Sequence, residues 1–157
     1  MAIDQYKRQR RTLQNQIARG RLIFLAVIAV TLINQIILWF TGNYHFLFSA
    51  AMPYYLNWLA GQLPSVGFKI VVTLVTLALY GVYGLCLLRF FEVQWMKTTM
   101  GMFAIDTALL AIFAFVLLEN PLSCLIELLI HGVILALLVS AYRARLRLAR
   151  LPRRDDL

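Results

Sequence analysis

Charged residues are scarce in this chain, and acidic residues are the scarcest. Only 14% of its 157 residues are charged, against about 25% in ordinary soluble domains, whereas 62% are hydrophobic. Seven acidic residues against fifteen basic ones leave a formal net charge of +8. This composition is typical of integral membrane proteins, and we expect a single all-α membrane domain.

Several chemical signatures are also missing. The two cysteines lack C-x-x-C spacing, and neither G-x-S-x-G nor a nucleic-acid-binding motif occurs. We therefore expect no metal, no cofactor and no nucleic-acid partner. A lipid-binding protein or a lipid-modifying enzyme stays open as an alternative, although its candidate groups near the outer surface form no visible triad. These groups are His45, Ser49, Ser123 and Cys124.

Four apolar runs have roughly the 20 residues that a helix needs to cross a bilayer core. The first run follows a basic segment, but it is longer than a signal-peptide core and no A-x-A-like site follows it, so we expect it to be retained. Short separators at 92–97 and 119–121 predict antiparallel hairpins between the later runs. The predicted transmembrane helices are 22–40, 70–91, 98–118 and 122–142.

The basic residues predict the orientation through the positive-inside rule. With four spans, 14 of the 15 Lys and Arg residues lie on the side of the N-terminus, and only Lys69 lies on the other side. We therefore expect both termini in the cytoplasm. The N-terminal arm (1–21) and the C-terminal tail (143–157) are predicted to be amphipathic and to contact anionic lipid headgroups, or else to grip an acidic partner protein. Candidate lipid contacts are Lys7, Arg8, Arg10, Arg11, Arg145, Arg147 and Arg150.

The stretch HFLFSAAMPYYLNWLAGQ, residues 45–62, is nearly as apolar as a span but contains Pro53 and Asn57. A fifth crossing would place all the C-terminal arginines outside, so the charge count argues against it. We expect segment 45–63 to lie in the outer interface or to re-enter the bilayer shallowly, with a short helix near 53–62. It would cover the bundle as an outer lid. The lid candidates are His45, Ser49, Pro53, Tyr54, Tyr55 and Trp58.

A few ionisable groups fall at membrane depth, where a charge costs about 2.5–3.5 kcal/mol on insertion scales. At 1.5 Å per residue, Asp106 and His131 lie about one helical turn apart in level, and Glu127 shares a helix face with His131. One hypothesis is a proton- or cation-handling site. The alternative is that these groups hold the bundle together through interhelical hydrogen bonds. The candidate site residues are Asp106, His131, Glu127, Tyr80 and Asn34.

The polar layer makes a small proton- or cation-handling transporter or channel the preferred hypothesis for function. A homo-oligomer is expected because one four-helix bundle has little room for a pore, and Gly81 and Gly84 provide a small-residue face for helix contact. The alternative is a non-catalytic scaffold or partner subunit that binds another membrane protein.

Three short patterns carry a family resemblance: FLFSA-x-x-PYY after the first span, F-x-x-D-T written FAIDT, and E-x-x-x-H before GVILAL. Together they resemble small uncharacterised four-helix membrane proteins of clostridial-type bacteria, over residues 22–138. The resemblance implies a bacterial cell membrane and brings no established activity. In those relatives Ala-Trp follows the histidine, where this chain has Gly132. The matching positions are Ser49, Pro53, Tyr54, Tyr55, Asp106, Glu127 and His131.

Overall fold

The chain folds into α-helices throughout the part that the computed structural model describes, which is residues 2–41, 49–62, 65–117 and 121–151. This confirms the all-α prediction. The helices are α1 (Ala2–Thr41), α2 (Ala51–Gln62), α3 (Val66–Leu88), α4 (Val93–Leu117) and α5 (Pro121–Ala149).

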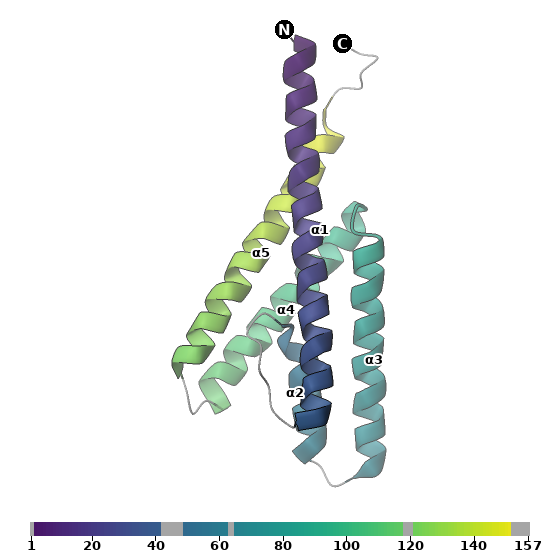
Figure 1. Ribbon diagram of the computed structural model, residues 1–157, viewed down its shortest axis with the longest axis vertical. Coiled ribbons are helices and arrows are strands. Elements are labelled where there is room, and N and C mark those ends of the chain that lie inside the picture. The colour runs from purple at the N-terminus through teal and green to yellow at the C-terminus, as the bar shows by residue number, and fades with distance from the viewer. Residues whose placement is uncertain (1, 42–48, 63–64, 118–120, 152–157) are drawn as a thin grey trace.

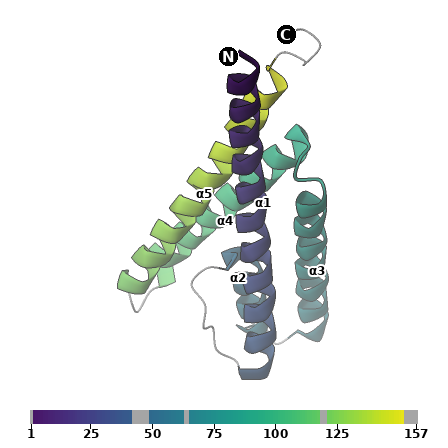
Figure 2. The ribbon, with the colours of Figure 1, turned by 45° about the horizontal axis from the view of Figure 1, so that its top comes forward.

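The long helices form an elongated bundle in which the first turns of α1 and the last turns of α5 lie at the same end (Figure 1). α1 packs mainly against α5, and α5 packs against α4. The short helix α2 contacts α1, α3 and α4, and it lies in the half of the molecule away from the termini (Figures 1 and 2). α2 is therefore surrounded by three of the long helices.

Three helical stretches within the described residues are long and apolar enough to cross a membrane: Asp4–Thr41, Val66–Leu88 and Leu125–Ala149. Large apolar side chains on α3 are widely exposed, including Leu74 at 60% and Leu88 at 72%. Exposed apolar surface of this extent suits contact with lipid. The predicted span 98–118 falls on α4, which is not one of these three stretches, and its last residue lies outside the described part.

The predicted N-terminal arm is the first half of α1 and not a separate helix. α1 runs without a break for 40 residues, or about 60 Å, through the arm and the first apolar run. Leu13 and Ile17 belong to the same buried cluster as Ala141 and Ala144 of α5. The arm is thus held along α5 by apolar packing.

At Gly20 the backbones of α1 and α5 approach closely. A Cβ atom at this position would lie 2.5 Å from the Cβ of Ala141, well inside van der Waals contact. Only glycine fits this crossing without a shift of one helix.

The hairpin between α3 and α4 is shorter than the separator predicted at 92–97. α3 ends at Leu88 and α4 begins at Val93, so Trp95 and Lys97 lie in the first turns of α4. No proline or glycine stops a helix between Glu92 and Lys97, so α4 can begin at Val93 and include these residues. α5 begins at Pro121, in agreement with the predicted restart, because proline suits the first position of a helix.

Candidate functional site

The centre of the site is the start of α2, which faces the carboxylate of Asp106 on α4. The backbone N–H of Ala51 donates to Asp106 Oδ2 at 2.9 Å, and that of Met52 donates to Oδ1 at 2.7 Å. Asp106 is completely buried. Both of its side-chain oxygens thus face the positive end of the α2 dipole and accept two of its N–H groups, an arrangement that favours the carboxylate form.

Two further side chains hold the residues just before α2. The N–H of Ala50 donates to Thr31 Oγ1 of α1 at 2.8 Å, while that hydroxyl donates to the carbonyl of Val27 at 2.7 Å. His131 Nε2 of α5 lies 3.0 Å from the carbonyl oxygen of Ser49. Because a carbonyl only accepts, this contact requires the hydrogen to be on Nε2.

These contacts account for every unpaired N–H at the start of α2. The first four N–H groups of such a helix have no partner within it. Here Ala50 has Thr31, Ala51 and Met52 have Asp106, and Pro53 carries no N–H. Three long helices therefore converge on one helix terminus.

Asp106 and His131 also face each other directly. His131 Nδ1 lies 4.0 Å from Asp106 Oδ2, and both side chains are 0% exposed. Nδ1 has no hydrogen-bond partner among the described residues. Since Nε2 carries a hydrogen, the lone pair of the neutral imidazole is on Nδ1, the nitrogen that faces the carboxylate.

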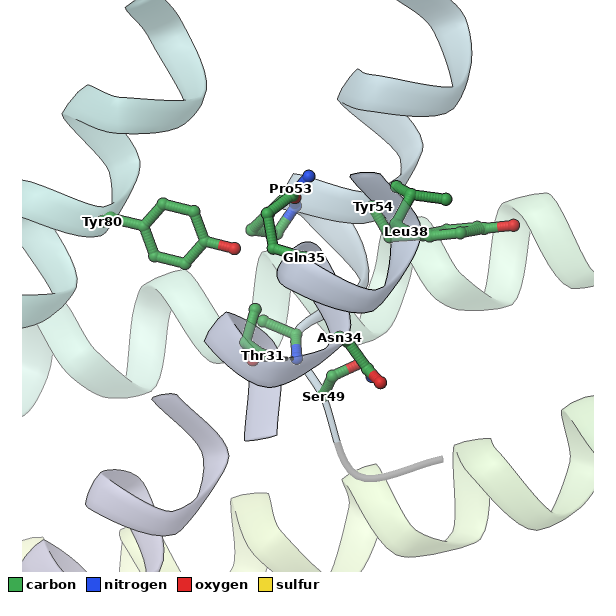
Figure 3. A pocket seen from close by; sticks show the side chains of 9 residues that line it. Thr31, Asn34, Gln35, Leu38, Ser49, Pro53, Tyr54 and Tyr80 are labelled. Carbon is green, nitrogen blue, oxygen red and sulfur yellow. Dashed lines mark hydrogen bonds between the residues drawn. The ribbon is translucent and has the colours of Figure 1, made fainter. Parts of the chain in front are cut away.

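A second set of polar groups lies beside this pair. Asn57 Nδ2 donates to Gln35 Oε1 at 2.9 Å and to the carbonyl of Pro53 at 2.7 Å, which ties α2 to α1. The Tyr80 side chain points toward Gln35 and Pro53 (Figure 3). Among the described residues, Tyr80 Oη and Gln35 Nε2 have no hydrogen-bond partner.

Two small cavities adjoin these groups. One of about 10 Å³, room for about one water, is lined by residues that include Thr31, Asn34, Ser49 and Tyr80 (Figure 3). The other, of about 100 Å³, lies between α1, α2 and α3 and is mostly apolar. Neither of these cavities is lined by Asp106 or His131.

The structure brings some of the predicted ion-site residues together and not others. Asp106 and His131 are neighbours, whereas Asn34 and Tyr80 line the adjacent small cavity. Glu127 is half-buried on α5 and lies close enough to Tyr54 to interact electrostatically with its hydroxyl. Among the described residues, no group of three or more His, Cys, Asp or Glu is placed to hold a metal ion.

The lid candidates are split between the interior and the surface. Ser49 and Pro53 are buried at the start of α2, and their backbones, not their side chains, make the contacts listed above. Tyr54 and Tyr55 are half-buried and pack edge to face with ring centroids 5.4 Å apart, and Trp58 is 38% exposed. His45 lies outside the described residues, as do the side chains of Ser123 and Cys124.

The basic candidates occupy two places at the end that holds the termini. Lys7, Arg8, Arg10 and Arg11 are exposed on the first turns of α1. Arg147 of α5 and Arg150, the residue after α5, are exposed, whereas Arg145 is half-buried and donates from Nε to the carbonyl of Phe91 at 2.9 Å.

Sequence reasoning missed the contribution of Thr31 and of the backbone around Ser49. A signal for both was present in Pro53. A proline in the first turn of an apolar helix marks a helix start whose remaining N–H groups need acceptors, and a buried Asp or Thr from another helix supplies them.

Comparisons with protein-family models, with curated proteins and with solved structures found no match. The functional proposal below therefore depends on the geometry of the residues themselves.

Proposed function

We propose that this chain is a small multi-pass membrane protein that handles protons at the Asp106–His131 pair, as a transporter or channel in a bacterial cell membrane. One observation carries the proposal: His131 Nδ1 faces the Asp106 carboxylate at 4.0 Å, in complete burial and with no hydrogen-bond partner of its own among the described residues. Carboxylate–imidazole pairs of this kind are the usual parts of membrane proton relays.

The proposed topology has α1, α3, α4 and α5 crossing the membrane, both termini in the cytoplasm, and α2 re-entering from the outer side. Arg21 of α1 and Arg145 of α5 both contact Phe91 in the α3–α4 turn, which supports a common level for the helix ends that we propose to be cytoplasmic. Thr31 lies ten residues beyond Arg21, or about 15 Å. Since Thr31 also contacts Ala50, α2 would begin near the middle of a core about 30 Å thick.

A helix that begins inside hydrocarbon must have its N–H groups satisfied by protein. Asp106 supplies two acceptors and Thr31 supplies one, which is the arrangement that a re-entrant α2 requires. The re-entrant alternative for segment 45–63 thus fits these contacts better than an interfacial one.

The geometry couples the proton to the position of α2. Asp106 accepts hydrogen bonds from α2 and at the same time faces Nδ1 of His131. A proton that moved from Nδ1 to the carboxylate would weaken its bonds to Ala51 and Met52, because a neutral carboxyl is a poorer acceptor than a carboxylate. Loading the site and releasing α2 are therefore linked steps in the proposed mechanism.

A proton suits this site better than a larger cation. Both carboxylate oxygens of Asp106 already accept N–H groups, and neither cavity described above opens onto the carboxylate. A metal or alkali cation needs several open oxygen ligands, whereas a proton needs one lone pair.

His131→Gln separates proton handling from structure. The glutamine Nε2 can still donate to the Ser49 carbonyl, but the side chain no longer binds a proton at neutral pH. In proteoliposomes with an internal pH-sensitive dye, we expect H131Q to abolish the proton flux of the native protein while its melting temperature stays within a few degrees. Native flux in H131Q and in Asp106→Asn would reduce the pair to a structural role.

A membrane scaffold or partner subunit is the second candidate. It is favoured by the absence of Asp106 and His131 from the lining of both cavities, and by Gly81 and Gly84 on α3, where an added Cβ would meet no atom within 4 Å. Such an open small-residue face suits close contact with another helix, including that of a second copy. A stoichiometric second protein after purification in mild detergent, together with a lack of proton flux, would establish this role instead.

A further inference from the structure

The turn between α3 and α4 gathers three arginines from different parts of the chain. The Arg21 guanidinium carbon lies 5.1 Å from the ring centroid of Phe91, and Arg145 Nε donates to the carbonyl of the same residue at 2.9 Å. Arg89, in the same turn, lies 5.7 Å from the ring of Trp95. We call Arg21, Arg89 and Arg145 the arginine corner.

The charges of the arginine corner are not neutralised within the described part of the chain. None of the three arginines forms a salt bridge with a described carboxylate, although the exposed Glu92 is next to Phe91 in sequence. Arg145 uses only Nε for its carbonyl contact, which leaves the N–H groups on its two terminal nitrogens available. The guanidinium groups of Arg21 and Arg145 both contact Phe91 and have no carboxylate partner among the described residues, so they are well suited to bind an anion.

Phe91 fixes both groups before any ligand arrives. A cation–π contact orients Arg21, and a hydrogen bond orients Arg145. Preorganisation of this kind lowers the entropy cost of binding.

The depth of the corner identifies the anion. The apolar run of α1 begins at Leu22, the run that starts on α3 ends in the turn at Phe91, and that of α5 ends at Tyr142, so all three meet polar sequence at the level of the corner. Trp95 and Tyr142 are aromatics of the type enriched at the headgroup level. Beside the corner, Leu22 is 65% exposed and would lie along an acyl chain.

We propose that Arg21 and Arg145 bind the phosphate of an anionic phospholipid at the cytoplasmic surface, with Arg89 adding to the positive field. This site differs from a diffuse basic arm. Lys7 lies 14 residues before Arg21, or about 21 Å along α1, whereas the headgroup layer is only about 5–8 Å thick on each side. The first basic residues of α1 therefore project beyond the headgroups.

The test compares two double variants that remove the same charge. R21Q/R145Q removes the corner, and R8Q/R11Q removes two exposed arginines from the projecting part of α1. Each protein is titrated in detergent with short-chain phosphatidylglycerol, and with phosphatidylcholine as the neutral reference, and bound lipid is counted by native mass spectrometry.

We expect R21Q/R145Q to lose about tenfold or more of its affinity for phosphatidylglycerol, and R8Q/R11Q to change by less than about twofold. Equal losses in the two variants would show diffuse attraction and overturn the site. Displacement of the lipid by millimolar inorganic phosphate would show that the free ion, and not the lipid, is the ligand.

A double lysine variant tests whether binding needs the planar guanidinium groups, and a single variant covers the case in which the double glutamine variant misfolds. R21K/R145K keeps both charges but lacks the planar guanidinium groups, so we expect it to bind phosphatidylglycerol more weakly than the native protein does. Native affinity in this variant would contradict binding of the phosphate by the two guanidinium groups. If R145Q disturbs the turn, R21Q alone carries the test, because Arg21 contacts the turn only through the Phe91 ring and forms no hydrogen bond with the described residues. None of these outcomes depends on proton flux at Asp106.

Discussion

Replacing Asp106 with alanine should release the start of α2. The substitution leaves the N–H groups of Ala51 and Met52 buried without an acceptor. Each such group costs about 1–3 kcal/mol, so the local free energy that holds α2 in place should fall by about 2–6 kcal/mol. Even the lower figure raises the open fraction of the segment roughly thirtyfold.

Amide hydrogen exchange in lipid nanodiscs measures this opening directly. Peptides that cover residues 49–62 should exchange at least about thirtyfold faster in D106A, while those from the middle of α1 keep their protection. In Asp106→Asn, exchange of residues 49–62 should be faster than in the native protein and slower than in D106A. The asparagine carbonyl oxygen still accepts one N–H, but its amide nitrogen faces the other.

Asp4 offers a matched control, since it is exposed near the start of α1. Asp4→Asn makes the same chemical change and should leave the exchange of α2 as it is in the native protein. Unchanged protection of Ala51 and Met52 in D106A would refute the capping role of Asp106. If D106A does not fold, D106N against D4N gives the same comparison.

Two other contacts can be tested in the same way. Thr31→Val removes the acceptor of the Ala50 N–H and should cost about 1–3 kcal/mol in thermal or denaturant unfolding, whereas Thr31→Ser should restore most of it; equal stability of the two variants would contradict the contact. Gly20→Ala should destabilise the α1–α5 crossing by about 1–3 kcal/mol despite the better helix propensity of alanine, and Ala141→Gly in the same chain should recover part of the loss. Gly81→Ala, where an added Cβ meets nothing within 4 Å, should be neutral or stabilising, and a loss there equal to that at Gly20 would argue against the crossing as the cause.

Hydropathy and charge predicted the long helices well, because apolar length and basic flanks are local properties of the sequence. The start of α5 at Pro121 followed from the same kind of local rule. The continuation of the N-terminal arm into one unbroken run with the first apolar helix did not follow from such a rule. Its basic side chains suggested a helix on the membrane surface, whereas Leu13 and Ile17 continue the packing face of α1 along α5.

The polar site was predicted in part. The costs of burying Asp106 and His131 indicated that they need partners, and their depths indicated that they are close, as they are at 4.0 Å. Their actual partners are backbone groups of residues 49–52. Pro53 indicates a helix start with N–H groups to satisfy, but side-chain patterns do not identify which groups meet it, so the sequence prediction assigned Ser49 and Pro53 to a lid.

The start of α2 gives the three sequence patterns a common physical cause. FLFSA-x-x-PYY supplies the carbonyl of Ser49, the N–H groups of the next three residues and a proline that needs no acceptor; F-x-x-D-T supplies the carboxylate; the last pattern supplies the imidazole. Inside an apolar bundle, loss of the carboxylate would leave the N–H groups of Ala51 and Met52 unpaired, and loss of the imidazole would leave the Ser49 carbonyl without this donor. In the proposed function the same carboxylate also faces Nδ1 of His131, so one group would link the start of α2 to a proton on the imidazole.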